Sequence, residues 1–196
     1  MKAFAYYLSG ILIEPVVVLA GILSELLRPN YRYEIERRIR GCIYSLYFAS
    51  SGVKIDHSVE MDGLSGIVLG NKVSLRSSSE IIAGSRGAVK VGDGTHVGRK
   101  SIVNGSGGGV YIGKKCAISS HVSIFSVSVD QIGLPAVSLP VIIGDEVLIG
   151  MGVVVMPGVT VGDGARIGAG SVVVRDVKAG ETVVGVPAKP LIVRQT

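Results

Sequence analysis

The chain has three histidines, His57, His96 and His121. Histidine is the side chain best suited to take a proton from a hydroxyl near neutral pH. His121, in ISSHVSIF, comes just before the longest interruption of a repeating apolar pattern, and Asp130 lies within that interruption. His121 is therefore the candidate general base, with Asp130 as the candidate carboxylate that orients it. The alternative for His121 is a polar side chain on the outer surface, where His57 and His96 are also expected.

The histidine spacing does not predict a metal site. A zinc site built from three histidines needs a closely spaced pair plus a distant partner, whereas these three are far apart in the sequence. Nucleotidyl transfer is disfavoured, because no glycine-rich nucleotide-binding motif precedes the repeat. The net charge of +5 indicates an anionic partner, either a phosphate-bearing cofactor or a membrane surface. Nucleic acid is not an expected partner, since no basic patch is interleaved with aromatic residues.

A repeat of six residues predicts the structural elements that position the candidate catalytic residues. An aliphatic residue recurs every six positions, usually followed by glycine, as in IGDEVL, IGMGVV and VGDGAR. This period fits neither a helix nor an alternating strand, and is typical of a coil of short parallel strands whose stepped residues point inward. Stacked coils then share one continuous core. In the second half the stepped residues are Ile112, Ile118, Ile124, Ile143, Ile149, Val155, Val161, Ile167 and Val173.

The coil domain is expected over residues 51–196, with two interruptions. NGSGGG, residues 104–109, predicts a flexible bulge, and residues 125–142 predict an external loop, the kind of segment in which such scaffolds place their chemistry. Cys116 occupies an apolar coil position and is expected to be a buried thiol in a reducing compartment. In the first half the stepped residues are Val53, Val59, Leu69, Leu75, Ile81, Val91, Val97 and Val103.

Residues 1–50 lack the step and predict a separate helical region. Two apolar runs flank Glu14-Pro15 and together are long enough for a bilayer core, although the proline would kink a helix there and the carboxylate would be costly. A basic amphipathic helix follows, and this combination predicts attachment to a membrane surface. The alternative is packing on the coil domain or on neighbouring subunits. The helix combines Ile35, Ile39, Ile43 and Leu46 with Arg32, Arg37, Arg38 and Arg40.

Residues 142–191 (IIGDEVLIGMGVVVMPGVTVGDGARIGAGSVVVRDVKAGETVVGVPAKPL) resemble the hexapeptide-repeat acyltransferases, and the resemblance extends over about residues 50–192. The branch that acetylates sugars of bacterial surface polysaccharides is the most similar. The resemblance implies a mainly β fold, a left-handed parallel β-helix preceded by N-terminal α-helices. It also implies a homotrimer whose acyl-CoA donor lies between neighbouring coils. The left-handed sense comes only from the resemblance, since parallel crossovers are generally right-handed.

Carried onto this sequence, the resemblance implies a site for acetyl-CoA as the acyl donor. Glycines would let the thin cofactor arm lie against the backbone, and cations would bind the phosphates of CoA. The alternative explanation involves no ligand: each glycine is required by the backbone conformation at a corner of the coil, and each cation is a solvated surface residue. The implied donor-binding residues are Gly150, Met151, Gly168, Ala169, Gly170, Arg175, Pro187, Ala188 and Lys189.

The chain departs from the family where the catalytic histidines are expected. Val127 and Val129 stand at those positions in FSVSVD, and Leu139-Pro140 stands where another branch has His-Pro. Two hypotheses follow. In the first, the chain is an acetyl-CoA-dependent O-acetyltransferase that uses His121 or an unrecognised base. In the second, the chain has lost catalysis and is a structural or regulatory subunit of a membrane complex that synthesises polysaccharide.

The first hypothesis is preferred. It predicts transfer to a sugar hydroxyl in bacterial surface polysaccharide biosynthesis, with a sugar or lipid-linked glycan as the acceptor. The membrane surface would be contacted through residues 1–50. The expected location is the cytoplasmic face of the bacterial inner membrane, with the cytoplasm as the alternative.

Overall fold

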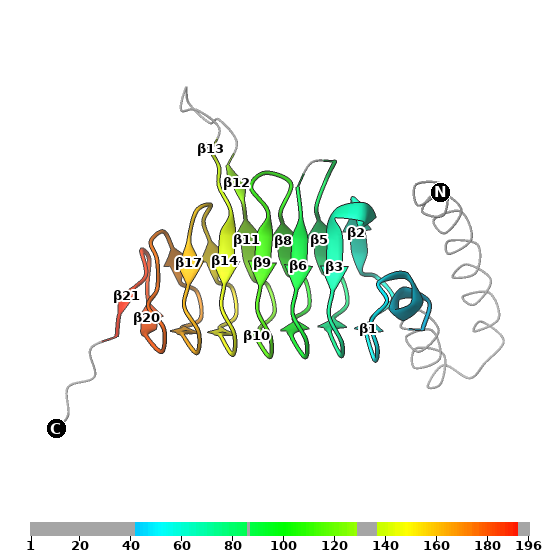
Figure 1. Ribbon diagram of the computed structural model, residues 1–196. Helices are drawn as coiled ribbons and strands as arrows, with labels where there is room; N and C mark the ends of the chain where they lie inside the picture. The colour runs from blue at the N-terminus through cyan, green and yellow to red at the C-terminus, as the bar shows by residue number, and fades with distance from the viewer. Residues whose placement is uncertain (1–41, 86, 129–136, 192–196) are drawn as a thin grey trace.

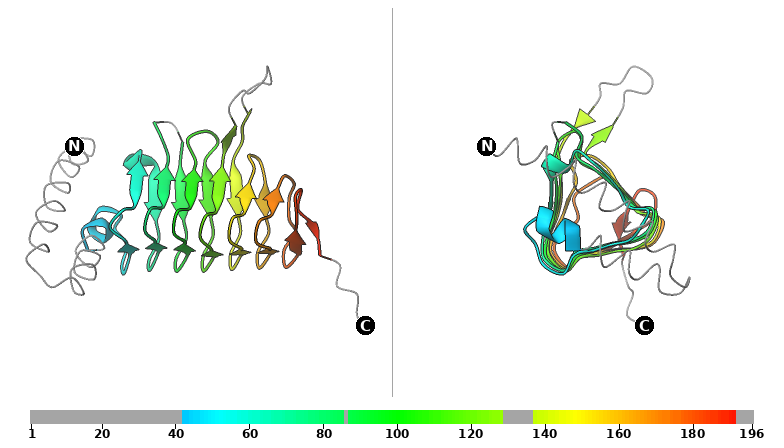
Figure 2. Two further views of the ribbon diagram at one scale, coloured as in Figure 1. Left: turned by 180° about the vertical axis from the view of Figure 1, so that it is seen from behind. Right: turned by 90° about the vertical axis from the view of Figure 1, so that its right-hand side faces the viewer.

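The computed structural model describes residues 42–85, 87–128 and 137–191. They form a parallel β-helix whose coils each contribute one short strand to three long sheets, so that the cross-section is a triangle (Figures 1 and 2). Five coils are complete, and a sixth has an isolated bridge at Val177 in place of a third strand. This mainly β, parallel helix of short strands is the architecture that the sequence predicts.

The three sheets collect the strands in a regular order. The first sheet contains β1 (Lys54–Ile55), β4 (Ser74–Leu75), β7 (His96–Val97), β10 (Ala117–Ile118), β15 (Leu148–Ile149), β18 (Arg166–Ile167), β20 (Thr182–Val184) and the antiparallel β21 (Lys189–Pro190). The second sheet contains β2 (Glu60–Asp62), β5 (Glu80–Ile82), β8 (Ile102–Asn104), β11 (Ser123–Phe125), β16 (Val154–Val155) and β19 (Val172–Val173). The third sheet contains β3 (Ile67–Leu69), β6 (Val89–Val91), β9 (Val110–Ile112), β14 (Val141–Ile143) and β17 (Thr160–Val161), and a short 3-10 helix, η1 (Leu64–Gly66), precedes β3.

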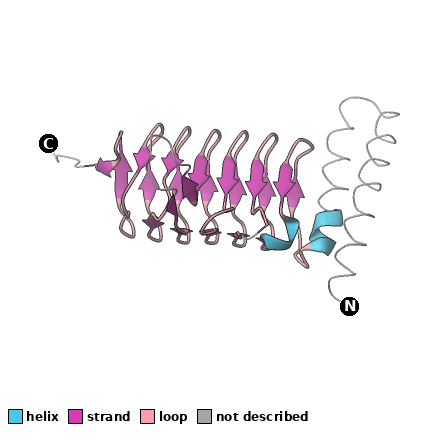
Figure 3. Cartoon of the chain, turned by 90° about the horizontal axis from the view of Figure 1, so that it is seen from above, coloured by secondary structure: helices cyan, strands magenta, loops and turns pink. Residues whose placement is uncertain are grey.

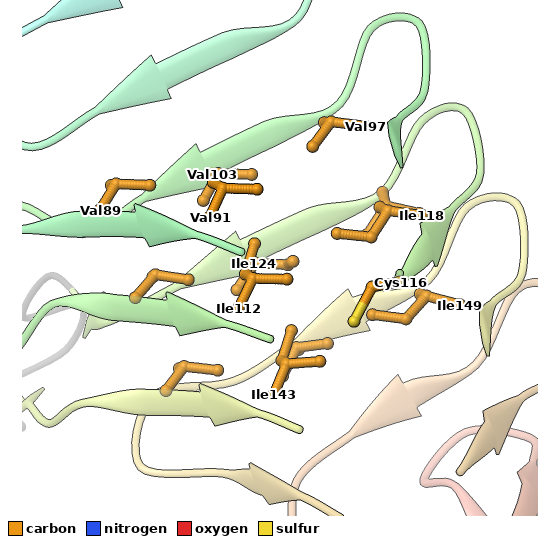
Figure 4. Packing of buried hydrophobic residues seen from close by; sticks show 14 of the residues in the cluster. Val89, Val91, Val97, Val103, Ile112, Cys116, Ile118, Ile124, Ile143 and Ile149 are labelled. Carbon is orange, nitrogen blue, oxygen red and sulfur yellow. The ribbon is translucent and has the colours of Figure 1, made fainter. Parts of the chain in front are cut away.

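The stepped residues form the core, as predicted. All seventeen of them are buried, and Ile118, Ile124, Ile149 and Ile167 are fully covered. Figure 4 shows how side chains from successive coils stack in the interior. Each strand is only two or three residues long, and from the second coil to the sixth it usually places one stepped residue inward. In the first coil Val53 and Val59 are buried beside the strands, and Ile55 takes the inward strand position, aligned with Leu75. Every coil therefore depends on its neighbours for burial. The Cys116 thiol also lies in this core, where burial raises its pKa.

The N-terminal end of the coil is covered by residues 42–48. Residues 42–47 are helical; Tyr44 is buried in the core cluster, and Phe48 packs against it. Leu46, on which the predicted apolar face relied, is 80% exposed. Tyr44 and Phe48, rather than Leu46, are therefore the residues by which this helix contacts the coil. Within the described part of the chain, no helix is long and apolar enough to cross a membrane.

Three edges of the triangle connect the sheets, and we name them by the sheets that they join. Edge 1–2 contains the turns that follow first-sheet strands, edge 2–3 those that follow second-sheet strands, and edge 3–1 those that follow third-sheet strands. Backbone hydrogen bonds link turns of successive coils, and the coils are about 4.8 Å apart, as neighbouring strands of a sheet are. Residues on one edge are therefore close in space although they are far apart in the sequence.

The interruption after β11 is a hairpin on edge 2–3. β12 (Val127–Ser128) pairs antiparallel with β13 (Val137–Ser138) and rises away from the coil (Figures 1 and 2). Its base rests on the glycine-rich turn one coil earlier: a Cβ on Gly107 would meet the Ser138 hydroxyl, and one on Gly108 would meet the backbone of Leu139. The bulge predicted at residues 104–109 therefore supports the hairpin.

Candidate active site

Edge 1–2 gathers most of the residues that the sequence identified. The backbone N–H of His121 donates to the carbonyl of Arg99 (2.9 Å), that of Gly152 to Ser120 (3.1 Å), and that of Gly170 to Met151 (2.8 Å). One line of turns thus joins the candidate base in the fourth coil to the predicted donor-binding residues of the fifth and sixth. The residues 120–170 that build this line belong to three coils, and the six-residue step sets their alignment.

His121 lies at the corner of the turn between β10 and β11. Its φ is 59°, the left-handed conformation that histidine adopts more readily than most residues. The side chain is exposed, so an acceptor can reach it. The hairpin starts at the other end of β11, after Phe125, and lies on edge 2–3 instead of edge 1–2. The base and the hairpin of one chain are therefore separated by the width of the second sheet. Asp130 and Val129 lie outside the described residues.

The predicted donor glycines fall into two classes. A Cβ on Gly150 would meet the backbone of Ala169 at 2.6 Å, and one on Gly168 would meet the side chain of Val184 at 2.6 Å, so packing between coils accounts for both. Gly170 differs: its φ is 69°, and a Cβ there would have nothing within 4 Å. Gly152, one coil earlier, has the same φ and the same open surroundings. Open backbone at these two corners fits a thin ligand that lies against the edge.

The terminal segment with Pro187, Ala188 and Lys189 follows β20, so it lies on edge 1–2 at the C-terminal end of the coil. Figure 3 shows the strands of this end beside the C-terminus. The Ala188 N–H donates to the Val172 carbonyl in the second sheet (2.8 Å), and Lys189 pairs with Val184 in the first sheet. The segment therefore crosses from one sheet to the other over the edge. Lys189 and Pro187 are exposed, while Ala188 packs against the core.

A buried hydroxyl, which the sequence analysis did not single out, ties this segment to the glycine turn. Ser171 is fully buried; its hydroxyl donates to the Gly168 carbonyl (2.7 Å) and accepts from the Gly185 N–H (3.0 Å). The two halves of the predicted donor site are thus held together by one serine. Ser171 lies two residues before the stepped residue Val173, so the repeat alone indicates that its side chain points inward. The repeat does not indicate that the chain folds back after β20 and brings the Gly185 N–H to the Ser171 hydroxyl.

Arg175 does not join the other predicted donor residues. It follows β19 and is exposed on edge 2–3, whereas the glycines and the terminal segment lie at edge 1–2. Its neighbour Asp176 accepts a hydrogen bond from the Thr160 N–H (2.7 Å), which fixes that turn. Arg166 is a cation that lies closer to the glycine turn. It is exposed in β18, two residues before Gly168.

His96 lies on the outer face of the first sheet, aligned with Ala117 in the next coil. Desolvation and the positive charge of Arg76 lower its pKa below 6.5, and Asp56 partly opposes the shift. Arg76 in turn pairs with the buried carboxylate of Asp56 (Nε to Oδ2, 3.4 Å). The fold therefore favours the neutral form of His96. Because its folded-state pKa is depressed, its contribution to stability is present above about pH 6.5 and is lost as the pH falls.

Replacing Arg76 by methionine is expected to raise the pKa of His96, because the repelling charge is removed while the attraction of Asp56 remains. An NMR titration of the histidine ring protons measures this pKa. Arg166→Met, on the same sheet but three coils away, is the matched control and should leave the value unchanged. An identical titration in Arg76→Met and the parent would show that the guanidinium does not act on His96.

A hollow of about 200 Å³ opens on the outer face of the second sheet, in the first two coils. Its lining includes three carboxylates, which would repel the phosphates of CoA. This hollow is therefore not the donor site. Among the described residues, no group of three His, Cys, Asp or Glu side chains is placed to hold a metal ion. The hollow is lined by Glu60, Met61, Asp62, Glu80 and Ile82.

Comparisons with known proteins agree with this architecture. The model of the bacterial transferase hexapeptide family (six repeats) matches residues 140–175. The dTDP-4-amino-4,6-dideoxy-D-glucose acyltransferase of Escherichia coli is 36% identical over 151 residues, which are 71% of this chain and 78% of that protein.

Solved structures share the fold. The N-acyltransferase AntD of Bacillus cereus, in complex with dTDP and 3-hydroxybutyryl-CoA, is similar with a TM-score of 0.69 at 23% identity, over 78% of this chain and 87% of that one. A hexapeptide-repeat acetyltransferase of Vibrio cholerae is similar with a TM-score of 0.58 at 20% identity, over 92% of this chain and 91% of that one.

Proposed function

Because the chain belongs to the bacterial hexapeptide-repeat acyltransferases, we propose that it transfers an acyl group from acyl-CoA to a sugar. The observation that carries this proposal is edge 1–2, where an exposed histidine is aligned with two open glycine corners and a cationic terminal segment. A proton acceptor at one end and a surface for a long anionic donor at the other are what acyl transfer from CoA requires.

The donor would lie along the C-terminal half of this edge. From the His121 turn to the terminal segment is three coil spacings, about 14 Å, so a flexible arm has to run along the backbone to connect them. The open corners at Gly152 and Gly170 leave room for that arm, and exposed peptide groups can bond its amides. Lys189 and Arg166, both exposed, would bind the phosphates.

His121 would act on the acceptor. Its imidazole takes the proton of the attacking group while that group forms a bond to the thioester carbonyl carbon. The carbon–sulfur bond then breaks, and the CoA sulfur leaves with the proton that the imidazole held. Backbone N–H groups of the neighbouring turns would stabilise the negative charge on the carbonyl oxygen.

The finer proposal is O-acetylation of a sugar hydroxyl during synthesis of bacterial surface polysaccharide. The second candidate is N-acylation of an amino sugar, favoured by the identity to an enzyme whose name specifies a dTDP-linked amino sugar. A neutral amine is already nucleophilic and needs less help from a base than a hydroxyl does. Parallel assays with an amino sugar and the matching hydroxy sugar, at equal acetyl-CoA, distinguish the two.

Calorimetry with acetyl-CoA tests the donor site directly. We expect saturable binding by the parent protein, and binding about tenfold weaker in Lys189→Ala, since one charge-assisted bond to a phosphate contributes about 1.5 kcal/mol. Dephospho-CoA should lose less affinity from the substitution if Lys189 binds the 3′-phosphate. A folded protein that does not bind acetyl-CoA at millimolar concentration would contradict the transferase proposal and favour the non-catalytic subunit.

Two further expectations, the oligomeric state and membrane attachment, remain predictions. A homotrimer is supported by the apolar outer face of the second sheet, where Ile102, Phe125 and Val154 are half-buried in the single chain. Membrane attachment through residues 1–50 is supported by the exposed Leu46 on the helix that ends there. Residues 1–41 lie outside the described part of the chain.

A further inference from the structure

The three edges of the coil carry different charges. Edge 3–1 has carboxylates at three corners, Asp93, Asp145 and Asp163, each of which accepts a hydrogen bond from the backbone of the preceding coil. The corners of edge 1–2 from the second to the sixth coil carry no carboxylate. Those corners are Ser77, Ser78, Arg99, Lys100, Ser120, His121, Met151, Gly152, Ala169 and Gly170. Of these two edges, edge 1–2 is therefore the one better suited to accept an anion.

The cations on this edge stand immediately before the candidate base. Arg99 and Lys100 follow β7, and both side chains are exposed. The Arg99 carbonyl accepts from the His121 N–H (2.9 Å), and the Lys100 N–H donates to the Ser77 carbonyl (3.1 Å). The first bond fixes the cationic turn one coil, about 4.8 Å, from the turn that holds His121, and the second ties it to the preceding coil.

Neither cation is neutralised within the described part of the chain. The two ion pairs found there join Arg76 to Asp56 and Lys115 to Glu146. Glu80 is the acidic residue on the adjoining strand, one coil earlier, and it makes no ion pair with Arg99 or Lys100. Two adjacent, exposed and uncompensated cations beside a catalytic base indicate a site for a doubly charged group.

We propose that Arg99 and Lys100 bind the diphosphate of the acceptor, so that the sugar is presented to His121 as a diphosphate-linked glycoside. This inference rests on the proposed function. The donor would occupy the edge on the C-terminal side of His121, so the acceptor has to approach from the N-terminal side, where these two residues lie. A guanidinium can bind one phosphate through two parallel bonds, and the ammonium can bind the other as a point charge.

The chain contains a matched control for this site. Lys114 and Lys115 form the equivalent dipeptide on edge 3–1, and Lys100 and Lys115 share the same φ of 53°. Lys115 is paired with Glu146 (3.3 Å), and the Lys114 N–H donates to the carboxylate of Asp145 (2.7 Å). The two turns thus have similar charge and conformation, but only the one on edge 1–2 adjoins His121.

The experiment compares three proteins by calorimetry: the parent, Arg99→Gln/Lys100→Gln, and Lys114→Gln/Lys115→Gln. The probes are inorganic pyrophosphate, dTDP and thymidine, each titrated with saturating CoA present so that the donor site is filled. We expect the parent to bind dTDP at least tenfold more tightly than thymidine. Arg99→Gln/Lys100→Gln should lose about 10- to 100-fold in affinity for dTDP and pyrophosphate, and Lys114→Gln/Lys115→Gln should bind as the parent does.

Thymidine binding equal to dTDP binding, equal losses in both double variants, or no diphosphate binding by the parent would each overturn the inference. Farnesyl diphosphate in detergent micelles is the fourth probe. Binding tighter than that of pyrophosphate identifies a lipid carrier, and tighter binding of dTDP identifies a nucleotide carrier; both outcomes support the diphosphate site. If pyrophosphate binds without CoA but CoA itself does not bind, the proposed function fails and the diphosphate site stands.

Discussion

His121→Asn is expected to lower kcat for acyl transfer by about 10²- to 10⁴-fold, the usual contribution of a positioned general base. Asparagine is chosen because it tolerates the left-handed backbone that His121 adopts (φ 59°). The melting temperature and the affinity for acetyl-CoA should therefore stay close to those of the parent. The acceptor KM should also change little, because the imidazole acts on the proton that is transferred and not on the phosphates.

His96→Asn is the control for the loss of a histidine, since His96 lies on the sheet face rather than on edge 1–2. It should transfer acyl groups at close to the parental rate. Parental turnover in His121→Asn together with a large loss in His96→Asn would move the base to the first sheet. Full activity in both variants would mean that neither His121 nor His96 takes the proton.

Gly170→Asn is expected to weaken acetyl-CoA binding by about 10- to 100-fold, because a side chain would occupy the open corner where the donor arm lies against the backbone. Gly164→Asn is the matched control. Gly164 lies on edge 3–1 of the same stretch of coil, has a φ of 65° against 69° for Gly170, and also has nothing within 4 Å of an added Cβ.

Both asparagine variants should lose the same small amount of stability, since their backbone strain is alike and neither side chain meets a neighbour. Calorimetry with acetyl-CoA and a thermal melt on each protein separate the two effects. If Gly170→Asn and Gly164→Asn bind acetyl-CoA equally well, the donor does not lie along edge 1–2, and Gly170 is glycine only because its turn needs a positive φ.

The sequence predicted the core well because a six-residue period leaves little freedom. Once Ile118, Ile124 and Ile143 are assigned to three faces of one coil, the positions of the other stepped residues follow. The left-handed sense did not follow from geometry, since parallel crossovers are generally right-handed; it came from the resemblance. The helical period before the coil indicated Leu46 as a packing residue, but Tyr44 and Phe48 make the contact. The side of the helix that packs depends on the position of the first coil, and the helical period does not contain that information.

The site was harder to predict than the core, because the environment of a corner depends on the coil next to it. Gly150 and Gly170 look equivalent in the sequence, yet one faces the backbone of Ala169 and the other faces open space. Arg175 resembled a donor residue by motif, but it lies at the far end of β19 from the others. The link from Ser171 to Gly185 depends on a turn whose path no periodicity specifies.

Both ends of the β-helix are covered in a way that opposes end-to-end assembly into fibres. A column of parallel strands exposes unpaired backbone groups at its first and last coils, and such ends can recruit identical columns. Here the last first-sheet strand, β20, pairs with the antiparallel β21, which cannot continue a parallel register, while Tyr44 and Phe48 cover the first coil. Shortening the chain at either end would therefore risk end-to-end polymerisation before it cost much of the core.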